Sequence, residues 1–205
     1  MISAVVPAYN EGKRIERVLE ELSDFVDEII VIDDASQDDT SGIASRYARV
    51  IRNKKNLGYI GSIKRGFNEA KGDIVVTLDA DGEHDPRYIP AMVSPIQNRK
   101  ADLVFGKRDQ VPRVSERVVS YMVRRRVGAK DTGTGFRAIR SGLAKRLELK
   151  GRCTCGIFAL EAKSKGAEIK EIRAPTRDID KPRGIAWDHF YQFFTVLKFL
   201  IKKRY

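Results

Sequence analysis

Three segments of the sequence carry acidic and polar side chains that could bind a metal or move a proton. They follow short strand-like runs at 2–6, 28–32 and 74–78, and they read PAYNE at 7–11, DD at 33–34 and DADGE at 79–83. Carboxylates of this kind bind divalent cations and act in proton transfer. Short apolar runs of this length are typical of strands buried in a parallel sheet.

The carboxyl ends of parallel strands lie at one edge of an open sheet, where ligands bind. We therefore expect the three acidic segments to meet there. Carboxylates that share a site repel each other unless a cation lies among them. Asp81 and Glu83 offer hard oxygen ligands that suit Mg²⁺ or Mn²⁺, and these ions share their other positions with substrate phosphates. Each segment taken alone could instead be a turn or a helix cap.

The elements around these segments alternate between helical and strand-like patterns. Helices are predicted at 11–24, 36–47, 58–70, from Pro86 onward, at 114–127 and over the last twenty residues, and further strands at 50–51, 103–105, 136–139 and 169–172. This alternation predicts an α/β fold with a mostly parallel central sheet flanked by helices. Because no repeat or linker interrupts the pattern, we expect a single Rossmann-like domain over residues 1–205.

Composition narrows the class of protein. The chain has 205 residues, of which 42% are hydrophobic and 33% charged, and no run reaches the ~18 apolar residues of a membrane span. With no recognisable signal peptide, we expect a soluble cytoplasmic protein with reduced thiols at Cys153 and Cys155. The net charge of +11 indicates an anionic partner, either a phosphorylated substrate, an acidic lipid surface or nucleic acid.

Five segments resemble glycosyltransferase family 2, of GT-A fold, and within it the dolichyl-phosphate mannose synthase-like branch of polyprenyl-phosphate glycosyltransferases. They are VVPAYNEGKRI from Val5, VIDDASQDDT from Val31, NLGYIGSIKRGF from Asn56, VTLDADGEHDPRYIP from Val76 and DTGTGFRAI from Asp131. The resemblance implies a single GT-A domain, with a nucleotide-sugar-binding half at 1–110, an acceptor half at 111–184 and a C-terminal amphipathic helix at 185–205.

The resemblance also implies a donor site and a metal site. The residues that would bind the nucleotide sugar are Pro7, Tyr9, Glu11, Ile32, Asp34, Asp79, Ala80 and Asp81, with Arg177 and Arg183 covering the diphosphate and Lys181 as a nearby alternative. Asp81 and Glu83 would bind Mg²⁺ or Mn²⁺. Many relatives carry glutamine or serine in place of Glu83, so a second carboxylate here reinforces the expected metal dependence.

A group of basic residues points to the acceptor. Four polar residues recur at a spacing that predicts one helix face, beside an apolar face of Val114, Val118 and Met122: Arg113, Arg117, Ser120 and Arg124. With Arg108 they predict a pocket for an anion, and the alternative is a solvated basic face. The resemblance implies that Arg108, Arg117 and Ser120 bind the phosphate of a lipid acceptor.

We expect direct, inverting transfer of a sugar from a GDP-mannose or UDP-hexose type of donor to a polyprenyl or dolichyl phosphate, with Asp81, Asp131 and Arg108 as catalytic candidates. The metal would stabilise the departing nucleoside diphosphate. A phosphate acceptor is already anionic and needs no strong base. If the acceptor were a hydroxyl of a growing glycan, a carboxylate would take its proton, with Asp131 as the candidate; otherwise Asp131 shapes the acceptor end.

Two other classes fit less well. A nucleotidyltransferase also uses paired carboxylates and magnesium, but it favours a glycine-rich basic loop after the first strand, which PAYNEGKRI matches poorly. A nucleic-acid-binding module is disfavoured because the strand ends are acidic and the aromatic residues are not interleaved with the basic ones. We therefore expect no nucleic-acid partner, and the sequence does not indicate an oligomeric state.

The C-terminal segment allows two interpretations. Apolar residues recur at helical spacing and precede a basic end at 202–204: Trp187, Phe190, Phe194, Leu197 and Ile201. Aromatic and basic residues together suit a helix that lies peripherally on the cytoplasmic face of an anionic membrane. The alternative is a helix that covers the protein core.

Overall fold

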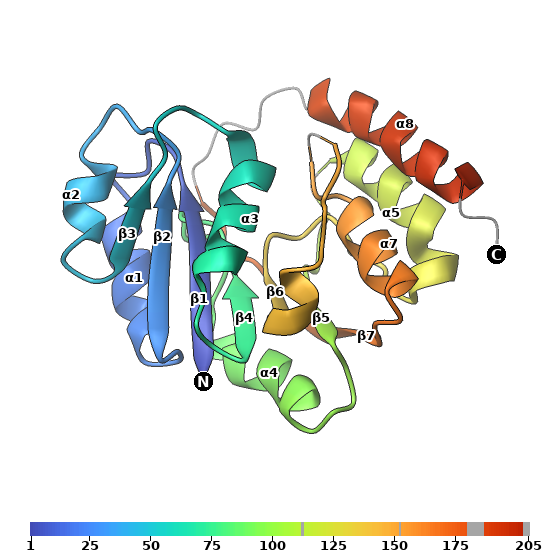
Figure 1. Ribbon diagram of the computed structural model, residues 1–205, viewed down its shortest axis with the longest axis horizontal. Helices are drawn as coiled ribbons and strands as arrows, with labels where there is room; N and C mark the ends of the chain where they lie inside the picture. Colours follow the sequence, from blue (N-terminus) through green and yellow to red (C-terminus); the bar gives the residue numbers. More distant parts are fainter. Residues whose placement is uncertain (112, 152, 180–186, 203–205) are drawn as a thin grey trace.

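The fold is built on one mixed sheet with helices on both faces (Figure 1). A computed structural model describes residues 1–111, 113–151, 153–179 and 187–202. The described residues form seven strands in the order β3-β2-β1-β4-β6-β5-β7. Their bounds are β1 Ile2–Ala8, β2 Glu28–Asp33, β3 Arg49–Arg52, β4 Ile74–Thr77, β5 Leu103–Lys107, β6 Arg137–Arg140 and β7 Ile169–Arg173. Only β6 runs antiparallel to its neighbours β4 and β5 within this described sheet, so the predicted mostly parallel α/β fold is confirmed.

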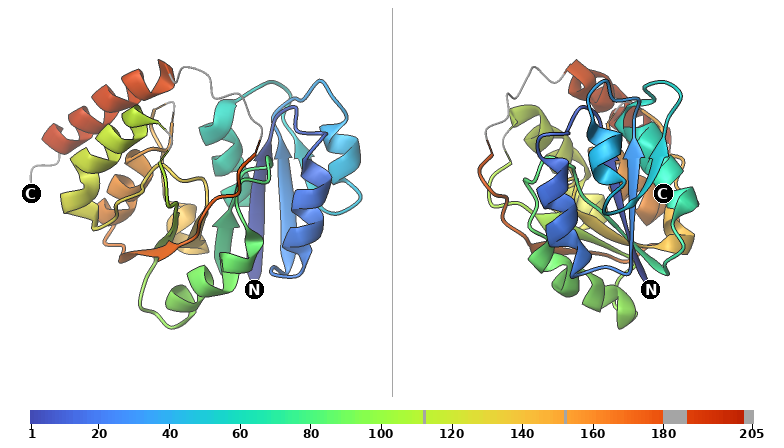
Figure 2. Two further views of the ribbon diagram at one scale, coloured as in Figure 1. Left: turned by 180° about the vertical axis from the view of Figure 1, so that it is seen from behind. Right: turned by 90° about the vertical axis from the view of Figure 1, so that its left-hand side faces the viewer.

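Helices cover the two faces of the sheet unequally (Figure 2). They are α1 Ile15–Ser23, α2 Thr40–Ala44, α3 Gly58–Glu69, the 3₁₀ turn η1 Pro86–Tyr88, α4 Ile89–Gln97, α5 Val114–Val127, α6 Ser141–Ala144, α7 Ile157–Ser164 and α8 Trp187–Lys202. Side chains alternate along β1, so that Val5 joins the core under α3, α5 and α7, and Val6 joins the core under α1 and α4.

The predicted elements are confirmed with shifts in their bounds. The largest shift is at α2, because the predicted start at Ser36 belongs to a turn. The Ser36 N–H donates to Asp33 at 3.0 Å, and the Ser36 hydroxyl accepts from the Asn10 N–H at 3.0 Å. This side chain therefore binds a neighbouring loop and does not cap the helix.

The interpretation of the C-terminal helix as a cover for the core holds for the buried side of α8, and the membrane interpretation stays a prediction. Gln192 and Val196 are fully buried, and α8 packs against α5. Phe194 and Ile201, by contrast, are 52% and 64% exposed. Among the described residues, no helix combines the length and apolar character that crossing a membrane requires.

Gly66 of α3 lies directly on Val5 of β1. A Cβ at position 66 would fall within 3.0 Å of Val5 Cγ1 and 3.1 Å from Cγ2. Overpacking of this kind costs about 1–3 kcal/mol. Gly66→Ala should therefore lower the free energy of unfolding by about 2 kcal/mol, measured by urea denaturation.

The matched control is Gly142→Ala in α6, where a Cβ would meet no atom within 4 Å. We expect its unfolding free energy to stay at or slightly above that of the wild type. Equal stability of the two variants would contradict the packing of α3 on β1.

Candidate active site

The three acidic segments meet at one edge of the sheet, as predicted. β1 lies between β2 and β4, parallel to both, so the carboxyl ends of the three strands are adjacent. The loops after β1 and β2 are bonded together: Glu11 N–H donates to Thr40 Oγ1 at 2.9 Å, and Gln37 N–H donates to Asn10 Oδ1 at 2.8 Å. The edge is therefore a connected structure made from segments far apart in the sequence.

The residues expected to bind the nucleoside lie along this edge to different depths. Tyr9 is 46% exposed and faces solvent beyond β1. Pro7 and Ile32 are buried partners across β1 and β2, and the Ile32 side chain packs in the core, so their contact with a nucleoside stays a prediction. Glu11 is mostly buried and pairs with Arg14 at 3.2 Å.

Asp34 is buried and bound within the protein. Its carboxylate accepts from the N–H groups of Leu57 and Gly58, each at 2.8 Å, and from Asn53 Nδ2 at 2.6 Å. These amides lie at the start of α3, where backbone N–H groups lack partners inside the helix. Asp34 therefore anchors α3 beside the edge, and its contact with a nucleobase stays a prediction.

The segment 79–83 makes a tight turn with carboxylates at both ends. Gly82 has a φ of +82°, a conformation that favours glycine, and Asp81 Oδ1 accepts from the Glu83 N–H at 3.0 Å. Asp81 is buried and Glu83 half-buried. The described residues hold no cluster of three or more His, Cys, Asp or Glu side chains close enough to hold a metal. The two oxygen donors fit Mg²⁺ or Mn²⁺ that takes its remaining ligands from water and a diphosphate.

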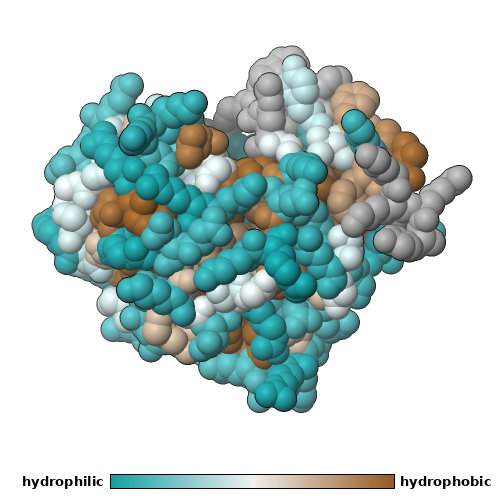
Figure 3. Space-filling view, in the orientation of Figure 1, coloured by the Kyte–Doolittle hydropathy of each residue, from teal (hydrophilic) through white to brown (hydrophobic). Residues whose placement is uncertain are grey.

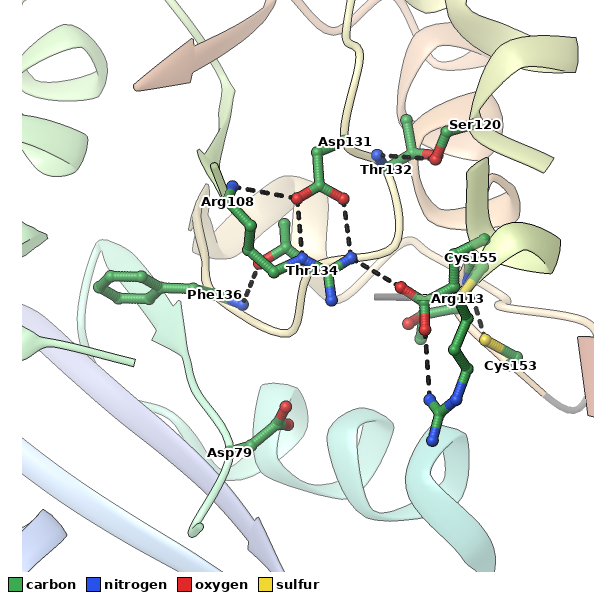
Figure 4. Close-up of polar contacts among 12 residues, drawn as sticks. Asp79, Arg108, Arg113, Ser120, Asp131, Thr132, Thr134, Phe136, Cys153 and Cys155 are labelled. Atoms are coloured by element: carbon green, nitrogen blue, oxygen red, sulfur yellow. Dashed lines mark hydrogen bonds and ion pairs between the residues drawn. The ribbon is translucent and has the colours of Figure 1, made fainter. Parts of the chain in front are cut away.

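Asp79 is held against the segment 131–136 (Figure 4). A Cβ on Gly135 would lie 2.8 Å from the Asp79 carboxyl carbon, so a larger residue would displace this carboxylate. Thr77 Oγ1 donates to the Gly135 carbonyl at 2.7 Å, which holds the glycine in place. His84 stacks on Phe136, with ring centroids 5.3 Å apart, and its Nε2 lies 3.6 Å from Asp79 Oδ2. The segment that carries Asp79 and the segment 131–136, some fifty residues apart in the sequence, thus pack together as one wall of the site.

A buried guanidinium lies behind this wall. Arg137 is fully buried, its guanidinium lies 4.7 Å from the centroid of the Phe158 ring, and it donates to Thr154 at 2.8 Å and to the Tyr59 hydroxyl at 3.5 Å. Burial and the nearby Asp79 carboxylate raise the pKa of Tyr59, so its hydroxyl stays protonated. Sequence reasoning missed both residues, although an arginine inside a strand-like run was a signal.

Arg108 and Asp131 form the centre of a buried ion-pair cluster in the region that the sequence predicted to bind the acceptor (Figure 4). Arg108 Nε and Nη2 donate to the two Asp131 oxygens, each at 2.9 Å, and Nη2 also reaches Glu116 at 2.8 Å. Arg113 pairs with Glu116 at 3.2 Å. Burial would raise the pKa of Asp131, but the hydrogen bonds and charge of Arg108 outweigh it and lower that pKa. Glu116 was not singled out in the sequence, although it lies three residues after Arg113.

The predicted basic face of α5 is only partly formed. Arg117 is exposed, but Ser120 is buried, and its hydroxyl lies 3.0 Å from that of Thr132. The expected apolar face is also displaced, because Val114 is 67% and Val118 45% exposed. The buried face follows a different set of residues: Glu116, Val119, Ser120, Val123 and Val127. Ser120 therefore does not share an exposed surface with Arg117.

The backbone of Arg177 lies beside the acidic turn, but its guanidinium pairs with carboxylates outside this turn. Its N–H donates to the Glu83 carbonyl at 2.8 Å, whereas its side chain pairs with Glu21 at 2.5 Å and Asp85 at 3.2 Å. To cover a diphosphate it must leave these two carboxylates. Arg183 and Lys181 lie outside the described residues.

The ion pair of Asp131 predicts a pH-dependent stability. Because the folded pKa lies below the ordinary value of 3.8, the stabilisation is complete above that value and is lost as the pH falls through the folded pKa. Breaking a buried pair costs about 3 kcal/mol. Asp131→Asn should therefore unfold about 3 kcal/mol more easily at neutral pH, and the difference should shrink at acidic pH below 3.8.

The measurement is urea denaturation of both proteins across this pH range. Asp24→Asn, which removes an exposed carboxylate after α1, serves as the control and should change stability by less than about 0.5 kcal/mol. A deficit of Asp131→Asn that stayed constant with pH would show that the charge of Asp131 is not what stabilises the fold.

Comparison with known proteins identifies the family. The family model of Glycosyl transferase family 2 matches residues 3–160. A dodecaprenyl-phosphate galacturonate synthase of Rhizobium johnstonii is 29% identical over 73% of this chain and 51% of its own length. A dolichol-phosphate mannosyltransferase of Pyrococcus furiosus is 35% identical over 52% of this chain and 33% of its own length. The chain thus spans a half and a third of these two relatives.

The same fold occurs in a solved enzyme. Glucosyl-3-phosphoglycerate synthase from Mycobacterium tuberculosis, in complex with Mn²⁺, uridine diphosphate and glucosyl-3-phosphoglycerate, superposes with a TM-score of 0.80 and 25% identity, over 98% of this chain and 79% of that one. The family match covers most of the 205 residues and includes the acidic turn and the segment 131–136. The chain belongs to glycosyltransferase family 2 and is a glycosyltransferase of GT-A fold.

Proposed function

We propose that the enzyme transfers a sugar, with inversion, from a nucleotide sugar of the GDP-mannose or UDP-hexose type to a polyprenyl or dolichyl phosphate, with Mg²⁺ or Mn²⁺. The observation that carries the proposal is the position of the acidic turn at 79–83, between the loops after β1 and β2 and the acceptor-side segment 131–136. Donor and acceptor would meet at this turn. The names of the Rhizobium and Pyrococcus relatives support a lipid phosphate acceptor.

Asp81 and Glu83 would bind the metal. When bound, the cation supplies positive charge that stabilises the departing diphosphate. The complex of the Mycobacterium enzyme with Mn²⁺ and uridine diphosphate supports this assignment. The nucleoside would lie along the edge formed by Tyr9, Glu11 and Asp34, beside the strand ends that carry Pro7 and Ile32.

Asp79 and Ala80 would contact the ribose or the sugar. A carboxylate repels a diphosphate but accepts hydrogen bonds from hydroxyl groups, so Asp79 suits the hydroxyl-bearing parts of the donor. Its contacts with His84 and Gly135 fix its direction before the donor binds. Such preorganisation lowers the cost of binding.

The ion-pair cluster favours a phosphate acceptor over a glycan hydroxyl. A hydroxyl acceptor needs a base, and Asp131 is poorly suited because its pKa is lowered and Arg108 occupies both of its oxygens. A phosphate oxygen is anionic at neutral pH and needs no such base. Arg117 and Arg113, which keep exposed surface, are the residues we assign to the phosphate; Arg108 supports Arg113 through their shared partner Glu116.

A polyprenyl acceptor also implies a peripheral position at a membrane surface. The lipid tail remains in the bilayer, so the enzyme must reach the phosphate at the level of the head groups. Arg177 completes the proposal as a residue that approaches the diphosphate once the donor has bound.

Metal binding can be tested without activity. A ligand that binds only the folded state raises its stability, so Mn²⁺ with uridine or guanosine diphosphate should raise the melting temperature of the wild type. In Asp81→Asn, most of this increase in melting temperature should be lost, because the substitution removes a metal ligand. For the same reason its kcat/KM should fall at least ~100-fold. Asp24→Asn is the matched control and should keep both. Turnover by Asp81→Asn that persists in EDTA would refute the metal-dependent mechanism.

The wall behind Asp79 gives a second test. Gly135→Ala would place a methyl group 2.8 Å from the Asp79 carboxyl carbon and force the carboxylate to turn. We expect kcat/KM for the nucleotide sugar to fall at least ~10-fold, with no such change in Gly142→Ala. Asp79→Asn should cause a similar loss, and the double variant should lose no more than either single one, because both act on one contact. Strictly additive losses would contradict this role of Gly135.

A further inference from the structure

A cavity of about 490 Å³ lies at the edge of the sheet opposite the active site, on the lower side of the molecule in Figure 1. It is lined by residues 71–73 before β4, Asp102 before β5, 140–146 at the end of β6 and in α6, and 165–167 before β7. Because β4, β5 and β7 begin here and the antiparallel β6 ends here, the cavity lies beyond the amino ends of the parallel strands. The acidic segments lie beyond the carboxyl ends, so the cavity is separate from the proposed donor and acceptor sites.

Hydrogen bonds join the stretches that line the cavity. The Ser141 N–H donates to the Asp73 carbonyl at 2.9 Å, and the Arg140 N–H donates to the Asp102 carbonyl at 3.0 Å. The Asp102 carboxylate accepts from the Glu168 N–H at 2.9 Å. The walls are therefore fixed by the fold itself, and a ligand that enters would not have to order them.

The charge of the lining is positive. Among its described residues, both acids are paired: Asp102 accepts from Arg140 Nε at 2.8 Å, and the Asp73 carboxylate pairs with the Met1 amine at 3.0 Å. Three further basic residues of the lining are exposed, and each comes from a different stretch of the chain: Lys71, Arg146 and Lys165. Converging cations of this kind attract an anion into the cavity.

A glycine in α6 keeps the cavity open. Gly142 is exposed, its φ lies outside the left-handed region, and a Cβ there would meet no atom within 4 Å. Neither backbone conformation nor packing therefore requires glycine, which is less favourable than alanine in a helix. The Gly142 carbonyl accepts from Arg146 Nε at 3.1 Å, so the guanidinium lies beside this open space. A longer side chain at position 142 would fill part of it.

We infer that this cavity binds a small anion with at least two phosphate groups, of the diphosphate or bisphosphate class. Arginine and lysine bind phosphate oxygens through charge-assisted hydrogen bonds. Cations on three separate stretches suit more than one phosphate, and the volume lies in the range of cavities that hold small molecules. The described lining includes no aromatic side chain that could stack on a base, so the phosphates carry the recognition. Figure 3 shows that hydrophilic residues dominate this lower part of the molecule.

Calorimetric titration with inorganic pyrophosphate tests the inference. In EDTA and at low salt, the full chain should bind one pyrophosphate, more tightly than it binds orthophosphate. Arg146→Gln/Lys165→Gln should weaken this binding at least ~10-fold, because two charge-assisted contacts are lost. Gly142→Leu should weaken it by a similar factor without any change in charge. Its melting temperature should stay near that of the wild type, since a Cβ at this position meets no atom.

The matched control is Arg125→Gln/Lys170→Gln, which removes two exposed charges outside the cavity and gives the same net charge as the cavity variant. It should bind pyrophosphate like the wild type. Equal losses in both double variants would overturn the inference, because binding would then follow net charge alone. A wild type that does not bind pyrophosphate, or Gly142→Leu that binds it normally, would overturn it too.

Two single variants separate the cavity from the active site. Arg117→Gln and Arg177→Gln, which alter residues assigned above to the acceptor and the donor, should bind pyrophosphate normally in EDTA. A loss in either that exceeds the loss in Arg146→Gln/Lys165→Gln would place the anion in the active site and refute the cavity. The titration needs no turnover, so its result does not depend on the proposed donor, acceptor or metal. Tighter binding of a single-stranded oligonucleotide, unaffected by Gly142→Leu, would indicate a polynucleotide surface instead and would also refute the inference.

Discussion

The segment 131–136 is the constraint on which the active site depends. At one end Asp131 accepts two hydrogen bonds from the Arg108 guanidinium and one from the Arg108 backbone N–H, and at the other Gly135 lies directly against the carboxylate of Asp79. Between them, Thr132 meets Ser120 of α5. One short stretch of backbone therefore fixes the distance between the acidic turn and the helix that carries the exposed arginines. Movement of this segment would disturb donor and acceptor residues together.

The two sides of the site differ in how far their charges are balanced by neighbouring side chains. On the predicted acceptor side, the buried Arg108 and the partly exposed Arg113 pair with the buried carboxylates of Asp131 and Glu116, so the positive and negative charges balance within the protein. On the donor side, Asp79, Asp81 and Glu83 come together within five residues, and the described residues complete no metal cluster there. A balanced cluster holds its shape without ligand, whereas an acidic turn favours a cation. This difference is the physical basis for placing metal chemistry on one side and positioning on the other.

α8 shows how one helix can serve both core and surface. Gln192 and Val196 are inaccessible to solvent, and Gln192 bonds to the backbone of Cys153 and Cys155 at 3.3 and 3.1 Å. These contacts explain why a helix rich in exposed aromatic residues still has a fixed position.

The sequence alone determined the α/β class, the helix and strand pattern, and the meeting of three acidic segments, because periodicity and strand order are local or follow from parallel topology. It also determined the family, since the motifs lie in family order. Only the tertiary structure decided which polar side chains are buried or already paired within the protein. The spacing of α5 placed Ser120 with Arg117, but packing buried Ser120 and exposed Val114 and Val118. The sequence predicted that Arg108 and Arg177 bind phosphates, but both pair with carboxylates in the structure. Glu116, which pairs with Arg108, lies on α5, and Glu21, which pairs with Arg177, lies on α1. Hydrogen bonds and ion pairs between distant segments have no period in the sequence, so only the folded chain reveals them.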